Sequence, residues 1–223
     1  MKVLLDYYVQ LAQNNEKTWF DAHRTEYEES QEMMKRLAEE LIQGVKQFDP
    51  RCEGLSPKDC LYRIYRDIRF SKDKRPYKDW HGIYVCPGGK KSGMAGYYIH
   101  LEPAHNVFFV CAGLYNPTKE VLQSVREQIM LEPDEFQQAI LDCGPDFKLN
   151  WDSALKRMPL GYKETDKCSE YYRLRSYEIY KTLTQEDVLD KHFMTHALDS
   201  LKRCYNFNEL LNKCFDYAYD PDK

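Results

Sequence analysis

Residues that can do chemistry are concentrated in residues 61–78, which read LYRIYRDIRFSKDKRPYK. Between residues 61 and 91, nine Lys or Arg stand against three Asp or Glu, although the whole chain carries a net charge of −4. Arginine holds phosphate and carboxylate groups by paired hydrogen bonds, and lysine adds a point charge. The stretch therefore indicates a site for an anionic ligand. Its predicted ligand-binding residues are Arg66, Asp67, Arg69, Lys72, Asp73, Lys74, Tyr77 and Lys78.

This basic stretch has two interpretations. Arg66 shares the apolar face of a predicted strand with Ile64 and Ile68, and an inward arginine needs an anionic partner. In the first interpretation that partner is a ligand. In the second, Asp67 and Asp73 neutralise the bases and Arg66 ties the strand to a helix. The neighbouring aromatic side chains either stack on a base or sugar or belong to the core, and these are Tyr65, Phe70 and Tyr77.

A second polar group lies on one face of a predicted strand, where Tyr98, His100 and Glu102 alternate with apolar residues. A His-x-Glu pair at this spacing can transfer protons, and a nearby phenol can donate a hydrogen bond. We therefore predict His100 and Glu102 as an acid–base pair, with Tyr98 beside them. The alternative is a structural histidine that is bonded to Glu102.

Four further bases, Lys156, Arg157, Arg173 and Arg175, lie downstream of this strand. If the strand predicted at residues 171–182 lies beside the first strand, they complete the anion site, and we include Arg157 and Arg175 among its predicted residues. Otherwise they form a solvated face.

Neither a metal site nor a cofactor is predicted. His192 and His196 are four residues apart, but Phe193 stands where a zinc protease motif has glutamate. The sequence GGKKSG at residues 88–93 lacks the spacing of a phosphate-binding loop and is interpreted as a hairpin tip.

The elements that position these groups follow from periodicity and from residues that begin or end helices. Strands are predicted at residues 61–70, 81–86, 95–102, 106–115 and 171–182, and helices at 4–11, 16–47, 116–130, 134–142, 184–201 and 206–219. Asn15 is the expected N-cap of the long helix, and Thr184 with Asp187 resembles a capping box. The order predicts one α+β domain over residues 1–223, with an antiparallel sheet of about five strands and helices from both termini packed on it. Its parts are a helical segment at 1–50, a sheet core at 60–116 and a mixed helical segment at 117–223.

Several motifs together resemble an uncharacterised bacterial family, a domain of unknown function of about 220–230 residues. They include R-x-x-R-D-x-R-F-S-K-D-K-x-P-Y-K from Arg63, GYYIHLEP from Gly96 and GLYNP from Gly113. The resemblance covers nearly the whole chain and implies a single α+β domain. It implies no function, which has to be argued from the sites.

Composition narrows the class of protein. No run of about 18 apolar residues is present, and the N-terminus lacks the apolar core of a signal peptide, so we expect a cytosolic protein without membrane contact. The eight cysteines occur singly, which favours reduced thiols. We expect a protein that binds a phosphorylated or other anionic small molecule through Arg66 to Lys78. The alternative is a module without catalysis that binds nucleic acid or an acidic protein.

Overall fold

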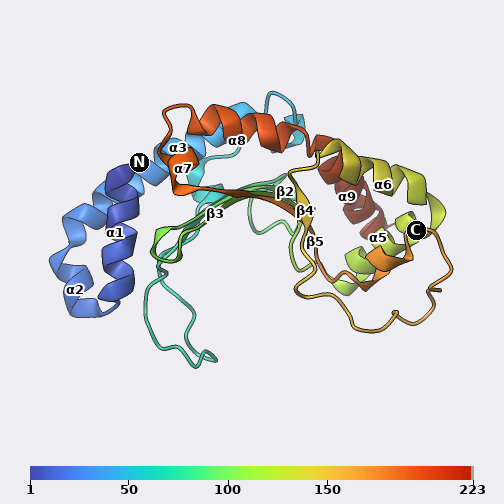
Figure 1. The fold of residues 1–223 in the computed structure, drawn as a ribbon, viewed down its shortest axis with the longest axis horizontal. Coiled ribbons are helices and arrows are strands. Elements are labelled where there is room, and N and C mark those ends of the chain that lie inside the picture. The colour runs from blue at the N-terminus through green and yellow to red at the C-terminus, as the bar shows by residue number, and fades with distance from the viewer. Residues whose placement is uncertain (222–223) are drawn as a thin grey trace.

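The computed structural model describes residues 1–221, and these form a curved antiparallel sheet with helices on one face and at both ends (Figure 1). The strand order is β1 (His81–Val85), β2 (Gly96–Glu102), β3 (Val107–Leu114), β5 (Tyr177–Leu183) and β4 (Lys148–Leu149). Every neighbouring pair is antiparallel. The predicted α+β class, with an antiparallel sheet of about five strands, is confirmed.

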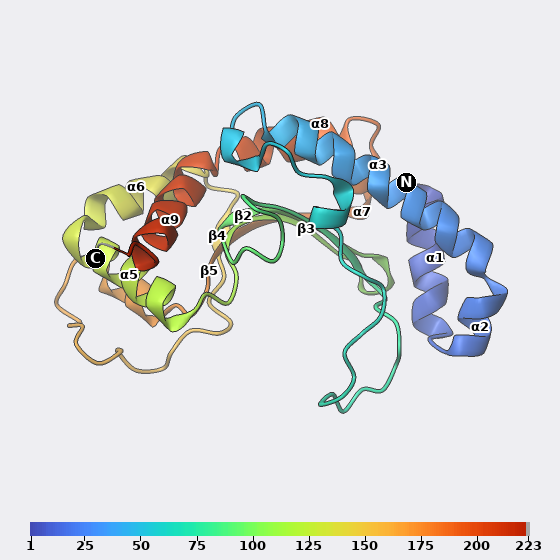
Figure 2. The same ribbon diagram turned by 180° about the vertical axis from the view of Figure 1, so that it is seen from behind.

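The helices are divided between the two ends of the sheet and its convex face. They are α1 (Lys2–Gln13), α2 (Lys17–Ala22), α3 (Arg24–Val45), α4 (Pro57–Cys60), α5 (Lys119–Leu131), α6 (Pro133–Asp142), α7 (Gln185–Leu189), α8 (Phe193–Lys202) and α9 (Tyr205–Ala218). Short 3-10 turns occupy Pro50–Cys52, Pro103–His105 and Ser169–Arg173. Both views show α3 and α8 across the convex face, with α5, α6 and α9 gathered at one end (Figures 1 and 2). In the described part of the chain, no helix covers the opposite, concave face of the sheet (Figures 1 and 2).

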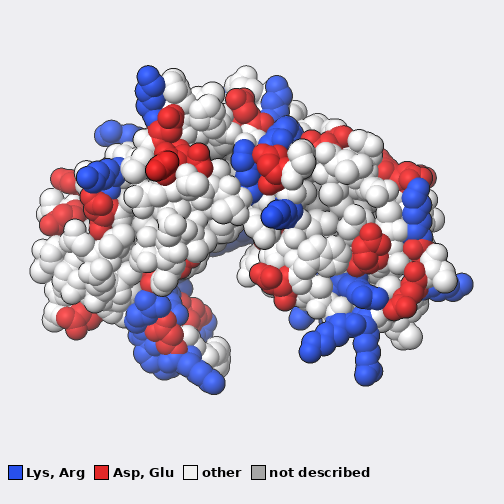
Figure 3. Space-filling model, in the orientation of Figure 1, with Lys and Arg blue, Asp and Glu red and all other residues white. Residues whose placement is uncertain are grey.

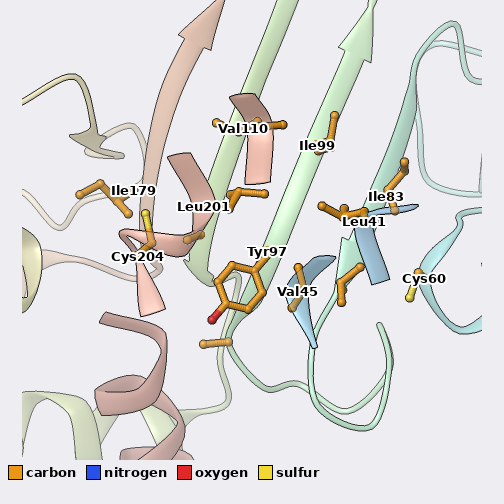
Figure 4. Close-up of a cluster of buried hydrophobic side chains, with 14 of the residues drawn as sticks. Leu41, Val45, Cys60, Ile83, Tyr97, Ile99, Val110, Ile179, Leu201 and Cys204 are labelled. Carbon is orange, nitrogen blue, oxygen red and sulfur yellow. The ribbon is translucent and has the colours of Figure 1, made fainter. Parts of the chain in front are cut away.

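The hydrophobic core lies between the convex face of the sheet and these helices. Alternation along the strands sends Tyr97, Ile99, Val110 and Ile179 to this face, where they are almost fully buried. They meet side chains from α3 and α8, which include Leu41, Val45 and Leu201 (Figure 4). Because the residues between them point to the other face, every polar or aromatic side chain at those positions is displayed on the concave side.

The prediction of a strand at residues 61–70 is wrong. The segment joins the sheet only at a single bridge from Leu61 to Ile83, and then leaves it. It turns back on itself, with a bridge between Tyr65 and Tyr77 and a hydrogen bond from the amide of Lys78 to the carbonyl of Ile64 at 2.8 Å. We call residues 61–80 the basic hairpin. It projects below the concave face (Figure 2), and Phe70 near its apex is 96% exposed.

Two other predicted elements are divided in the structure. The helix expected at residues 16–47 breaks at His23, whose ring stacks on Trp19 with 4.0 Å between centroids. Its N-cap is Glu16, and Asn15 makes other contacts. The helix expected at 184–201 is α7 followed by α8, although the Thr184–Asp187 capping box is present. Of the strand expected at 171–182, only the part from Tyr177 is extended.

Among residues 1–221, no helix combines the length and the apolar character needed to cross a membrane.

Candidate ligand pocket on the concave face

The concave face holds a cavity of about 390 Å³, within the usual size range of small-molecule sites. Its walls come from the base of the basic hairpin, from β1, β2, β3 and β5, and from the turn between β1 and β2. Six of the side chains that line it are aromatic, namely Tyr62, Trp80, Tyr84, Tyr98, Phe109 and Tyr115. Polar or ionisable lining groups are His100, Glu178, Lys90 and Cys111.

Tyr98, His100 and Glu102 form a continuous chain of hydrogen bonds along β2. The Tyr98 hydroxyl lies 2.9 Å from Nδ1 of His100, and Nε2 of His100 lies 3.1 Å from Glu102. His105 contacts the other carboxylate oxygen of Glu102 at 2.8 Å. The sequence prediction that Tyr98, His100 and Glu102 share one face is therefore confirmed, since strand alternation places all three on the concave side.

Burial sets the protonation states in this chain. It lowers the pKa of His100, although the nearby Glu102 carboxylate opposes the effect, and it raises the pKa of Tyr98. With a neutral imidazole, the consistent arrangement has Tyr98 donating to Nδ1 while Nε2–H donates to Glu102. Both ring nitrogens of His100 are then occupied, and the Tyr98 oxygen keeps the capacity to accept a further hydrogen bond.

Glycine at position 82 makes room for this tyrosine. A Cβ built there would lie 2.2 Å from the Tyr98 hydroxyl oxygen and 2.5 Å from Cε2 of the ring. Tyr84, which faces Tyr98 in the strand register, donates its hydroxyl hydrogen to the carbonyl of Met94 at 2.7 Å. The phenols on β1 and β2 are thus held in fixed orientations.

Glu178 is the residue that sequence analysis missed. It lies on β5 opposite Gly113 and contributes a carboxyl group to the cavity wall. Burial raises its pKa to about 7, and a hydrogen bond with Asn150 partly opposes this. Among the described residues, no ion pair to Glu178 is formed. The sequence does carry one indication of this role. Glu178 lies between Tyr177 and Ile179, and because both of these are buried in the core, strand alternation turns Glu178 toward the concave face.

The charges of the basic hairpin are largely matched within the hairpin. Arg66 pairs with Asp73 at 2.8 Å, and Arg69 pairs with Asp67 at 2.6 Å. Arg75 bridges Asp73 and Asp79 at 2.9 and 2.7 Å. Of these pairs, only the one between Arg66 and Asp73 joins the two arms of the hairpin. The second interpretation of the sequence is confirmed in that Asp67 and Asp73 neutralise these bases. Its expectation that Arg66 ties a strand to a helix is wrong, because both contacts of that guanidinium lie within the hairpin. The assignment of Arg66, Arg69, Asp67 and Asp73 to a ligand site stays a prediction.

Two lysines lie closer to the cavity. The Lys78 ammonium lies 5.0 Å from the ring centroid of Trp80 and 5.4 Å from that of Tyr62, and it donates to the carbonyl of Arg63 at 2.8 Å. Burial lowers the pKa of Lys78. Lys90 lines the cavity from the β1–β2 turn and donates to the carbonyl of Lys58. Neither ammonium group has a carboxylate partner among the described residues.

The other predicted residues are dispersed. Lys72 is exposed near the hairpin apex, Lys74 donates to the carbonyl of Ile68 at 3.0 Å, and the buried Tyr77 ring stacks on Phe20 at 4.1 Å. Arg157 and Arg175 belong to the segment that joins β4 to β5, the two strands at the opposite edge of the sheet. Figure 3 shows Lys and Arg gathered on the hairpin and again on that segment, with a hollow between them.

Arg157 and Arg175 were expected to complete the anion site only if the strand at residues 171–182 lay beside the first predicted strand. It does not, because β5 pairs with β3 and β4. His192 and His196 have ring centroids 6.2 Å apart. Within residues 1–221, no group of three or more His, Cys, Asp or Glu side chains is arranged to hold a metal ion.

A family model described as "Conserved hypothetical protein (DUF2461)" matches residues 3–209. The search of curated proteins and the search of solved structures each gave no match.

Proposed function

Since the chain belongs to the DUF2461 family of conserved hypothetical proteins, we propose a function from its pocket, namely the binding of a phosphorylated or otherwise anionic small molecule. In this proposal the flat body of the ligand lies among the aromatic side chains of the cavity. Its anionic group would be bound by Lys90, which lines the cavity, and by Lys78, whose ammonium lies over two of the lining rings.

The observation that carries this proposal is the placement of Lys78. Its ammonium is held against two rings that also line the cavity, and burial has removed part of its hydration. A partly desolvated ammonium binds an anion more strongly than one in bulk water, because the local dielectric constant is lower. An incoming phosphate would therefore find a cation that is already positioned and only weakly neutralised.

The aromatic walls support a ligand with a flat body. Tyr84, Tyr98 and Phe109 lie on adjacent strands, and the centroids of Tyr98 and Phe109 are 5.9 Å apart. Such side chains bury large apolar areas while their ring planes restrict the shape that fits between them. The volume of about 390 Å³ suits one small molecule rather than a polymer.

In this proposal His100 and Glu102 act through Tyr98. The imidazole has no nitrogen left for the ligand, whereas the Tyr98 hydroxyl that donates to it can still accept a hydrogen bond. A proton that the ligand gives to the Tyr98 oxygen can pass to His100, whose cation Glu102 stabilises. Acid–base chemistry at this site would therefore begin at Tyr98.

Calorimetric titration with inorganic phosphate, ribose 5-phosphate and nucleoside monophosphates tests the proposal. We expect Lys78→Ala to weaken binding by about tenfold or more, because it removes a charge-assisted contact. Lys72→Ala is the matched control, since Lys72 lies on the same hairpin and is exposed. Equal losses in the two variants would move the anion site to the hairpin apex. No binding by the wild-type protein would reject the proposed function.

The alternative is a single-stranded nucleic acid bound between the basic hairpin and the segment that joins β4 to β5. It is supported by basic side chains on both of these segments. Lys72 on one side and Lys156 and Arg157 on the other have no carboxylate partner among the described residues. Such binding would weaken steeply as salt concentration rises. Oligonucleotides bound more tightly than any mononucleotide, with that salt dependence, would favour this alternative.

A further inference from the structure

We propose that the pocket recognises a planar ring that donates N–H hydrogen bonds to Glu178, so that its ligand class is a nucleoside phosphate or a compound with the same two ends. This inference rests on the proposed function. It adds the chemical identity of the part of the ligand that contacts the sheet.

The carboxyl group of Glu178 has unused capacity to accept hydrogen bonds. A carboxylate offers about four acceptor positions. Asn150 occupies one of them, and among the described residues no Lys, Arg or His forms an ion pair with it. Its neighbour across the register is Gly113, so no side chain stands between the carboxyl group and the cavity on that strand. A half-buried acceptor of this kind is satisfied when a ligand donates to it.

The surroundings of Glu178 select a ring as the donor. Burial is the main cause of the raised pKa values of Tyr84 and Tyr98, and the nearby charge of Glu178 adds to it. Both phenols line the same cavity. A flat heterocycle places N–H groups at its edge and apolar faces on both sides, which matches an acid set among aromatic rings. A saturated sugar or an alkyl chain leaves those ring faces without a flat partner.

A fully cationic ligand also suits an acid among aromatic rings, but two observations disfavour it. Lys78 already places an ammonium over Tyr62 and Trp80. Lys90 adds a second positive charge to the lining. A ring that donates N–H bonds satisfies Glu178 without adding a cation beside these two lysines.

The acid and the lysines are far enough apart to serve different ends of one molecule. β5 and β1 are separated by β2 and β3, which places the two strands about 14 Å apart. Glu178 lies on β5, whereas Lys78 and Lys90 flank β1 on either side in the sequence. The ring of a nucleoside phosphate can therefore meet the carboxylate while its phosphate meets the ammonium groups.

The test compares guanosine, inosine and adenosine monophosphates and ribose 5-phosphate by calorimetry. Guanine presents two adjacent N–H donors that a carboxylate accepts together, inosine lacks the amino group, and adenine presents a ring acceptor. We expect guanosine monophosphate to bind about tenfold or more tightly than the other two nucleotides. Glu178→Gln should remove this ranking and leave the affinity for ribose 5-phosphate unchanged, whereas Glu186→Gln, at an exposed position on α7, should preserve both.

Three results would overturn the inference while leaving the proposed function in place. They are equal affinities for the three nucleotides, a ranking that Glu178→Gln does not alter, and ribose 5-phosphate binding as tightly as guanosine monophosphate. No binding by any of the four compounds or by inorganic phosphate would overturn both. The urea unfolding curve of Glu178→Gln verifies that the variant is folded before its affinities are interpreted.

Discussion

The side-chain amide of Asn15 pairs with both backbone polar groups of Tyr77. Its Nδ2 donates to the Tyr77 carbonyl at 3.0 Å, and the Tyr77 amide donates to its Oδ1 at 3.0 Å. This is the pattern that one residue of a neighbouring strand would make, supplied here by the turn between α1 and α2. The basic hairpin, which has a single isolated bridge to the sheet, is thereby fastened to the N-terminal helices.

We expect Asn15→Ala to lower the free energy of unfolding by about 1–3 kcal/mol, because two backbone groups of a buried tyrosine lose their partners. Urea unfolding measures the loss, and hydrogen exchange at the Tyr77 amide locates it. Asn14→Ala is the control, since the exposed Asn14 side chain bonds only to the carbonyl of Gln10. Unchanged exchange at Tyr77 would contradict the fastening role.

Glu178→Gln should stabilise the free protein at pH 8 by about 1–2 kcal/mol and have little effect at pH 4. The folded-state pKa of Glu178 is raised from 4.5 to about 7, so its contribution to stability is present below pH 4.5 and is lost as pH rises through 7. The expected magnitude is below the full linkage value because the side chain is partly exposed. Unfolding curves at the two pH values measure it, and a stabilisation independent of pH would contradict the mechanism.

His81 predicts the opposite dependence on pH. It is buried on the core side of β1, its Nε2 has no partner within the described residues, and burial lowers its pKa from 6.5 to about 4. The unfolded chain binds a proton at higher pH than the folded one, so stability falls as pH drops from about 6.5 to 4, by up to about 3 kcal/mol.

His81→Phe should remove this component of the pH dependence, whereas His105→Ala, at an exposed position, should leave it in place. Thermal unfolding between pH 4 and pH 7 distinguishes the two. The assignment to His81 is wrong if both variants retain the wild-type dependence of stability on pH.

Gly82→Ala tests whether the space beside Tyr98 is required. The added methyl group would overlap the Tyr98 hydroxyl and ring, so we expect a loss of about 1–3 kcal/mol together with a loss of ligand binding. In a Tyr98→Ala background the same substitution should cost much less, because the clashing ring is gone. If the losses of unfolding free energy of the two single variants simply add in the double variant, the added methyl group does not clash with the Tyr98 ring.

Strands with one buried and one polar face could be predicted from the sequence. On β2 the alternation of Tyr97, Ile99 and Leu101 with Tyr98, His100 and Glu102 reflects two different environments, so both the strand and the polar cluster followed from it. The same alternation at residues 61–70 was misleading. Ile64 is buried there, but Phe70 is exposed, and ion pairs within the hairpin replace pairing with the sheet.

Other features depend on contacts between distant segments. Glu178 looks like an ordinary outward-facing residue of a strand, and it lines a cavity only because the hairpin base and the β1–β2 turn are folded beneath the sheet. The helix break at His23 could not be predicted from the sequence, because no Gly or Pro lies at that position. Asn15 has the composition of a helix cap, yet it bonds to a partner 62 positions away.

The bridge between Leu61 and Ile83 also affects how copies of this protein behave toward one another. β1 is an outermost strand of the sheet, and an outermost strand with free backbone groups invites a foreign strand to pair. The hairpin begins by occupying that edge at Ile83 and then departs as a strongly charged segment. At the far edge β4 has only two residues. Both margins of the sheet are thus poor templates for edge-to-edge aggregation.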